Sequence, residues 1–146
     1  MHDFTSRLID EYIKKLFKNS NIDQKKIRVL HITNFNIRHN GRLFYNTGRR
    51  INNGFVKLGH TVQTFSDRDI NSQDRKITDI YGSNSLNYRL LEIVGNFNPH
   101  LIVLGHADQI SNNTLEQIRK FYPSIKFCQW FLDRMDNENW KTNKLR

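Results

Sequence analysis

The stretch of sequence that decides the fold is residues 26–62, which read KIRVLHITNFNIRHNGRLFYNTGRRINNGFVKLGHTV. Residues 27–33 are rich in β-branched and apolar side chains, as is typical of a short strand covered on both faces. Residues 34–41 are polar, end in a glycine and predict a loop. A helix should follow, with Gly59 ending it and residues 60–65 forming a second strand. The apolar stripe of this helix, in steps of four, three, four and three residues, is Phe44, Gly48, Ile51, Phe55 and Leu58.

A strand, a helix and a strand in this order form a βαβ unit, whose crossover is right-handed. The first loop therefore lies at the carboxyl edge of the sheet, where open α/β sheets bind ligands. The alternation continues with a helix over residues 83–97, a strand at 100–106, a helix from Ser111 to Phe121 and a strand at 125–132. The sequence predicts an α/β fold with a Rossmann-like, open, mainly parallel sheet and helices on both faces.

Three segments are expected along the chain. Residues 1–22 hold an extra amphipathic helix, which should pack across the sheet or against a partner. Residues 23–134 form the α/β domain, in which residues 76–81 are a candidate edge strand. Residues 135–146 are a polar tail or the start of a continuation. The apolar stripe of the first helix is formed by Phe4, Leu8, Tyr12 or Ile13, and Leu16 with Phe17.

The positive charge is concentrated in the first βα unit. The chain carries a formal net charge of +9, and residues 24–66 contain eight lysines and arginines but no aspartate or glutamate. Such an edge attracts phosphates, sugar nucleotides, acidic glycans, anionic lipid headgroups or nucleic acid. We interpret Arg49, Arg50 and Lys57 as the solvated face of the helix. Arg38, in contrast, lies in the loop that faces the helix N-terminus, where anions bind.

Several classes of protein are not expected. There is no Gly-x-Gly-x-x-Gly after the first strand and no Gly-Lys-Ser/Thr loop, which argues against the standard dinucleotide and P-loop sites. Histidine spacing predicts no metal site, and no cofactor is expected. Cys128 sits in an apolar run and should be a buried, inert thiol. Without a signal peptide or an apolar run of ~20 residues, we expect a cytoplasmic protein, peripheral at most to the inner membrane surface.

Polar residues follow each predicted strand and should meet at the carboxyl edge. Histidine and aspartate can act as general bases for a hydroxyl nucleophile, whereas arginine and loop N–H groups hold anionic oxygens. The residues are Asn34, Arg38, His39, Asn40 and Gly41 after the first strand, Ser66 and Asp67 after the second, His106 and Asp108 after the next, and Asp133 and Arg134 after the last.

Residues 26–62, 98–106 and 127–133 resemble the N-terminal domain of two-domain GT-B glycosyltransferases, nearest to the group-1 and spore-maturation-protein-like branch. The similar features are the helix ending in Leu-Gly-His-x-Val, the strand after Asn-Pro, and the strand ending in Trp-x-x-Asp. His100 stands where the family usually has an aspartate. The resemblance implies an acceptor-binding half, incomplete and inactive without a C-terminal domain that holds the nucleotide-sugar.

By this resemblance, His106 and Asp133 are the candidate catalytic residues, with His39 as an alternative base. The residues expected to bind the nucleotide-sugar or the acceptor, a glycan or other hydroxyl compound, are Asn34, Arg38, Asn40, Gly41, Asp108 and Arg134.

Two other functions stay open. The chain could be a non-catalytic Rossmann-like module that binds a nucleotide or another anion at its basic edge. It could also be a domain that serves only in assembly. Nucleic acid is not expected, because recognition needs aromatic side chains between the basic ones on an exposed face, and the helix pattern buries Phe44 and Phe55.

Overall fold

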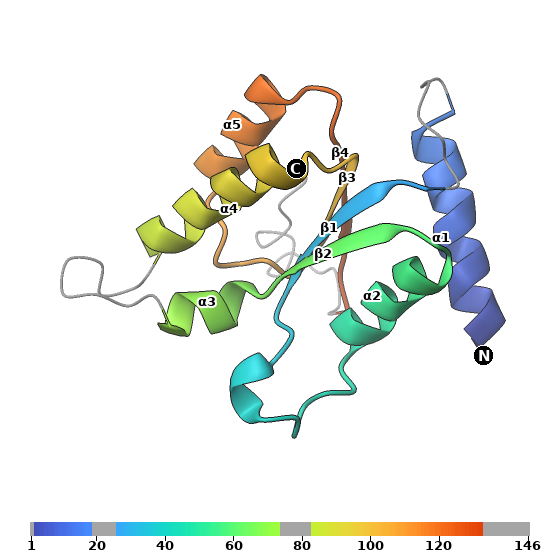
Figure 1. Ribbon diagram of the computed structural model, residues 1–146, viewed down its shortest axis with the longest axis horizontal. Coiled ribbons are helices and arrows are strands. Elements are labelled where there is room, and N and C mark those ends of the chain that lie inside the picture. Colours follow the sequence, from blue (N-terminus) through green and yellow to red (C-terminus); the bar gives the residue numbers. More distant parts are fainter. Residues whose placement is uncertain (1, 19–25, 74–82, 133–146) are drawn as a thin grey trace.

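The computed structural model describes residues 2–18, 26–73 and 83–132 and has a four-stranded, all-parallel sheet (Figure 1). The strands are β1 (Arg28–Thr33), β2 (Thr61–Phe65), β3 (Leu101–Gly105) and β4 (Lys126–Trp130), in the order β2-β1-β3-β4. β1 and β3 are the two central strands, and the predicted open, parallel α/β fold is confirmed.

Helices cover both faces of the sheet, as predicted (Figure 1). On one face lie α1 (His2–Leu16) and α2 (Thr47–Lys57), and on the other lie α4 (Ser83–Phe97) and α5 (Asn112–Phe121). Successive strand side chains point to opposite faces: Val29 packs with α1 and α2, whereas Leu30 packs with α4 and α5. A short α3 (Asp67–Gln73) follows β2 directly.

The N-terminal helix packs against the sheet and α2, which is one of the two predicted placements. Of the residues proposed for its stripe, Ile13 and Phe17 are buried, whereas Leu8 and Tyr12 are about half exposed. The buried stripe of α1 is therefore rotated toward Ile13 and Phe17.

The predicted start of the second helix was wrong. α2 begins at Thr47, because the Asn46 side chain caps it by accepting a hydrogen bond from the backbone N–H of Arg49 at 2.8 Å. Phe44 lies in the preceding loop and is 43% exposed, so it does not belong to the buried stripe. The predicted end of the helix is confirmed, since Gly59 follows the C-cap with a φ of +84°.

Arg49 also differs from its predicted place on the solvated helix face. It is half buried, and its guanidinium lies 4.2 Å from the ring centroid of Phe44. Its Nη2 donates a hydrogen bond to the backbone oxygen of Phe35 at 3.4 Å. Arg49 thus fixes the loop between β1 and α2. The candidate strand at residues 76–81 and the tail at 135–146 lie outside the described residues.

Candidate functional site

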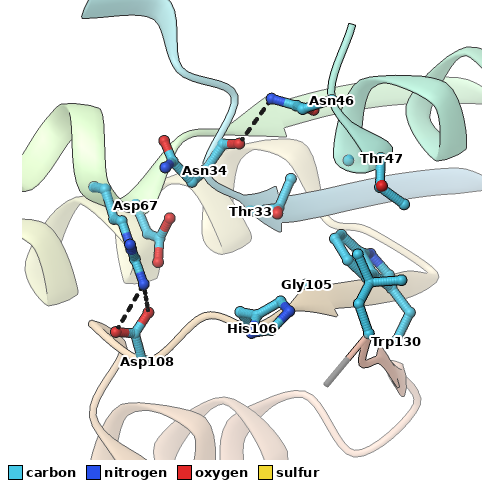
Figure 2. A pocket seen from close by; sticks show the side chains of 12 residues that line it. Thr33, Asn34, Asn46, Thr47, Asp67, Gly105, His106, Asp108 and Trp130 are labelled. Carbon is cyan, nitrogen blue, oxygen red and sulfur yellow. Dashed lines mark hydrogen bonds and ion pairs between the residues drawn. The ribbon is translucent and has the colours of Figure 1, made fainter. Parts of the chain in front are cut away.

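A cavity of about 300 Å³ opens at the carboxyl edge of the sheet, where the predicted polar residues were expected to meet. Its walls come from the ends of β1 and β3, the start of α2, the start of α3, and β4 (Figure 2). Segments far apart in the sequence therefore supply it, as is usual for ligand sites of parallel α/β sheets.

One wall is the N-terminus of α2, including Asn46, Thr47 and Gly48. The Nδ2 of Asn46 donates to the backbone oxygen of Asn34 at 3.3 Å, which ties the helix start to the loop after β1. A Cβ at Gly48 would lie 2.7 Å from Cγ2 of Thr33, so only glycine allows the helix to approach the strand this closely. The positive end of the α2 dipole thus faces the cavity.

The opposite wall contains the buried carboxyl of Asp67. This side chain is 1% exposed, and its Oδ1 has no hydrogen-bond partner among the described residues. Burial raises the pKa of Asp67 to about 6, and the nearby charge of Asp108 adds to the shift. Buried carboxyls are normally hydrogen-bonded, so an orphan oxygen on a cavity wall indicates a place for a ligand that donates a hydrogen bond.

The floor follows β3, where the backbone takes an unusual path. His106 and Ala107 have φ values of +61° and +39°, and the N–H of Ala107 bonds the oxygen of Gly105 at 2.8 Å. Consecutive non-glycine residues in this region are uncommon, and such conformations cluster at functional sites. The turn holds the His106 ring in a stack with Phe131, with centroids 4.7 Å apart.

Trp130 forms the aromatic wall. A Cβ at Gly105 would lie 2.2 Å from the Trp130 ring, so the indole packs flat on the β3 backbone. Its Nε1 donates to Nε2 of His31 at 3.2 Å. Because His31 accepts there, its Nδ1–H donates to Oδ1 of Asn52. Burial lowers the pKa of His31 to about 4, so the ring is neutral at pH 7.

An ion pair separates this cavity from a neighbouring polar pocket. Arg68 Nη2 lies 3.2 Å from both carboxylate oxygens of Asp108, and both residues line both spaces (Figure 2). Although burial acts to raise the pKa of Asp108, the charge of Arg68 and a hydrogen bond from Gln109 hold it below its usual value. The pKa of Asp108 therefore lies below its usual value and that of Asp67 above it, so Asp108 loses its proton at a lower pH than Asp67 does.

The structure brings together part of the predicted site. Asn34, His106 and Asp108 line the main cavity, and Arg38 lines the neighbouring pocket. Arg38 does not reach the α2 N-terminus, because Asp69 lies 3.7 Å away and the oxygen of Arg68 accepts from its Nη1. Among the described residues, His39, Asn40 and Gly41 are not part of the cavity lining. Asp133 and Arg134 lie outside the described residues.

Sequence reasoning gave too little weight to Asp67 and missed Trp130. Asp67 was placed at the correct edge but was not selected, because nothing in its local sequence shows that it is buried. Trp130 was assigned only to the last strand. Its register opposite Gly105 becomes visible only when β3 and β4 pair.

Comparisons of the chain with protein-family models, with curated proteins and with solved structures found no match. Within residues 2–18, 26–73 and 83–132, histidine, cysteine and acidic side chains form no group of three that could hold a metal ion. Cys128 is buried there, and burial raises its pKa to about 12, as its apolar surroundings predicted. No helix of the described part is long and apolar enough to cross a bilayer.

Proposed function

We propose that this chain is the acceptor-side domain of a glycosyltransferase that uses a nucleotide-sugar donor. The observation that carries the proposal is the orphan Oδ1 of Asp67 on the wall of a polar and aromatic cavity. Ligand cavities typically combine an apolar or aromatic wall with a few fixed polar groups. Here Trp130 and the stacked His106 supply rings for a sugar to pack on, and Asp67 supplies an acceptor for a hydroxyl proton.

In this proposal Asp67, rather than His39, is the general base. The acceptor hydroxyl donates a hydrogen bond to Asp67 Oδ1. As its oxygen attacks the anomeric carbon of the donor, the bond to the nucleotide diphosphate breaks and Asp67 takes the proton. A pKa of about 6 suits this role, because the carboxyl is mostly ionised at pH 7 yet more basic than an exposed aspartate. The α2 N-terminus would stabilise the negative charge of the departing diphosphate.

The proposal is tested by adding UDP-, GDP- and ADP-sugars, each with a panel of free sugars, to the 146-residue chain. Binding is followed by amide and indole N–H resonances, because transfer is not expected without the domain that holds the donor. We expect shifts at Gly48, Gly105, His106 and the Trp130 indole, and their loss in Asp67→Asn. Glu92→Gln, on the exposed surface of α4, removes the same charge and should bind normally. Shifts confined to other regions, or no binding at all, would overturn the proposal.

The alternative is a non-catalytic module that binds a nucleotide or another anion. It is favoured by one observation, the α2 N-terminus that faces the cavity from a segment without acidic residues. The same experiment separates the two functions. A nucleotide without sugar that binds equally well to the unchanged chain and to Asp67→Asn supports the module. Sugar-dependent binding that needs Asp67 supports the glycosyltransferase.

A further inference from the structure

The segment between β1 and α2 exposes large apolar side chains that the core does not use. Tyr45 is 83% exposed and Ile37 59%, and Leu43 and Phe44 are each 43% exposed. Figure 1 shows the 3₁₀ turn η1 (Ile37–His39) and the loop after it extending beyond α2 and α3 at the bottom of the view. We call residues 37–45 the projecting segment. Several large apolar side chains exposed on one short segment mark a candidate interaction site.

Basic side chains flank this apolar surface. Arg42 and Arg50 are exposed, and Arg38 is 37% exposed. Residues 24–66 contain no aspartate or glutamate, so the segment has no acidic neighbour in sequence. Asp69 from α3 contacts the segment, but it is 2% exposed and faces inward, where it accepts from the N–H groups of Ile37 and Arg38. The outer surface of the segment therefore combines apolar and positively charged groups.

The segment is held in place rather than free to fold back. Asp69 anchors its beginning, and the hydrogen bonds from Asn46 and Arg49 to backbone oxygens of residues 34 and 35 anchor its base. The guanidinium of Arg49 also covers one face of the Phe44 ring. A surface that is already ordered loses little conformational entropy when it binds a partner.

The combination fits an anionic bilayer better than the other partners of matching charge. Tyrosine and phenylalanine at the headgroup level, aliphatic side chains at the acyl boundary and arginines near anionic lipids are the features of interfacial binding. Phe44 is exposed, which corrects the prediction that the helix buries it. Single-stranded nucleic acid would also use exposed aromatic side chains. However, Ile37 and Leu43 cannot stack on bases, and Arg49 occupies one face of Phe44. A second copy would bring two positive surfaces together.

We propose that the projecting segment docks this protein onto an anionic lipid bilayer. Leu43, Phe44 and Tyr45 enter the headgroup and acyl boundary, and Arg42 and Arg50 pair with lipid phosphates. The proposal is independent of glycosyl transfer, because residues 37–45 are not in the described lining of the cavity. Docking and ligand binding can therefore fail separately.

The test is flotation of the 146-residue chain with vesicles of phosphatidylcholine, alone or mixed with phosphatidylglycerol. We expect much stronger binding to the mixed vesicles than to phosphatidylcholine alone. The double variant Leu43→Ser/Tyr45→Ser should lose about tenfold or more in partition, because two apolar side chains no longer leave water. The control, Tyr88→Ser/Phe121→Ser, removes two rings that are 64% and 69% exposed on α4 and α5, and this variant should bind as the unchanged chain does.

Circular dichroism and thermal unfolding establish that each variant is folded. As a second readout, Tyr45→Trp should shift its emission to the blue on mixed vesicles. Absence of binding to mixed vesicles would overturn the proposal, as would equal binding by the Leu43→Ser/Tyr45→Ser variant. A single-stranded oligonucleotide that binds more tightly than the vesicles, with the same dependence on Leu43 and Tyr45, would instead assign the segment to nucleic acid.

Discussion

At the scale of single residues, Asp67 is in an environment that opposes its own charge. Its pKa in the folded protein is about 6 and its ordinary value is 3.8, so the folded state holds the proton more tightly than the unfolded state does. The stabilisation that this gives is complete below pH 3.8 and is lost as the pH rises to 6. At pH 7 the fold is about 3 kcal/mol less stable, through this group, than in acid.

Asp67→Asn should therefore raise the free energy of unfolding at pH 7 by about 1–2 kcal/mol, because it removes a buried charge of nearly the same shape. Urea denaturation at pH 7 measures this, with Glu92→Gln as the control. If the Asp67 carboxylate instead stabilised the fold, the substitution would lower the free energy of unfolding. If Asp67→Asn is less stable than the unchanged chain at pH 7, the account of an unpartnered carboxylate is wrong.

His31 produces a pH dependence of the opposite sign. Its pKa is about 4 in the fold and 6.5 ordinarily, so stability is complete above pH 6.5 and falls as the pH drops to 4. The full effect is about 3 kcal/mol. Burial also lowers the pKa of His60 and His100, which act in the same direction. Between pH 6.5 and 4, acid therefore lowers stability through these histidines and raises it through Asp67.

We expect the free energy of unfolding of the unchanged chain to change little from pH 6.5 to 4, because the two effects offset each other. Removing either group should expose the pH dependence of the other. In Asp67→Asn, the free energy of unfolding should fall steeply with acid. In His31→Gln, which removes the main opposing group, it should fall less than in the unchanged chain or should rise. Denaturant titrations at half-unit steps of pH measure both. Parallel profiles for the two variants would contradict the assignment.

At the scale of elements, most strands and helices could be predicted from their hydrophobic pattern, whereas the short, polar α3 could not. β3 is an unbroken apolar run, β1 is rich in β-branched and apolar residues, and the apolar residues of α4 and α5 recur every three or four positions. The start of α2 could not be predicted, because Phe44 in the preceding loop happens to continue the three- and four-residue spacing of the apolar side chains in α2. The role of His100 could not be predicted either, because it depends on β1 and β3 lying side by side. Its Nδ1 accepts a hydrogen bond from the backbone N–H of Arg28 at 3.1 Å, which an aspartate at this position could also do.

The junction of β1 and α2 depends on the fit of Gly48 to Thr33. Gly48→Ala should destabilise the fold by about 1–3 kcal/mol, because its Cβ would lie 2.7 Å from Cγ2 of Thr33. Thr33→Ser removes that methyl group, so the double variant should recover part of the loss. Urea denaturation of both single variants and the double variant gives the coupling free energy. Strict additivity would show that the helix start does not press on the strand.

At the scale of the whole molecule, the cavity and the projecting segment share the loop between β1 and α2. Asn34 and Asn46 line the cavity from the two ends of this loop, and residues 37–45 lie between them. Long loops at the carboxyl edge of a parallel sheet commonly carry function, because the scaffold fixes their ends. A bilayer bound to the segment would thus contact the loop whose two ends line the cavity.

The charge distribution predicts how this docking responds to salt. Arg42 lies in the segment and the exposed Arg50 follows it closely in sequence, and the Debye length falls from ~10 Å at 0.1 M to ~3 Å at 1 M salt. Vesicle binding by the unchanged chain should therefore weaken strongly across this range without disappearing, because the apolar contacts are not screened.

Two variants separate the contributions. Arg42→Gln/Arg50→Gln should weaken low-salt binding and flatten the salt dependence, whereas Leu43→Ser/Tyr45→Ser should abolish the binding that remains at high salt. Flotation at stepped salt concentrations measures both contributions. Binding that is unchanged by salt would refute the electrostatic contribution, and complete loss of binding by the unchanged chain at high salt would refute the apolar one.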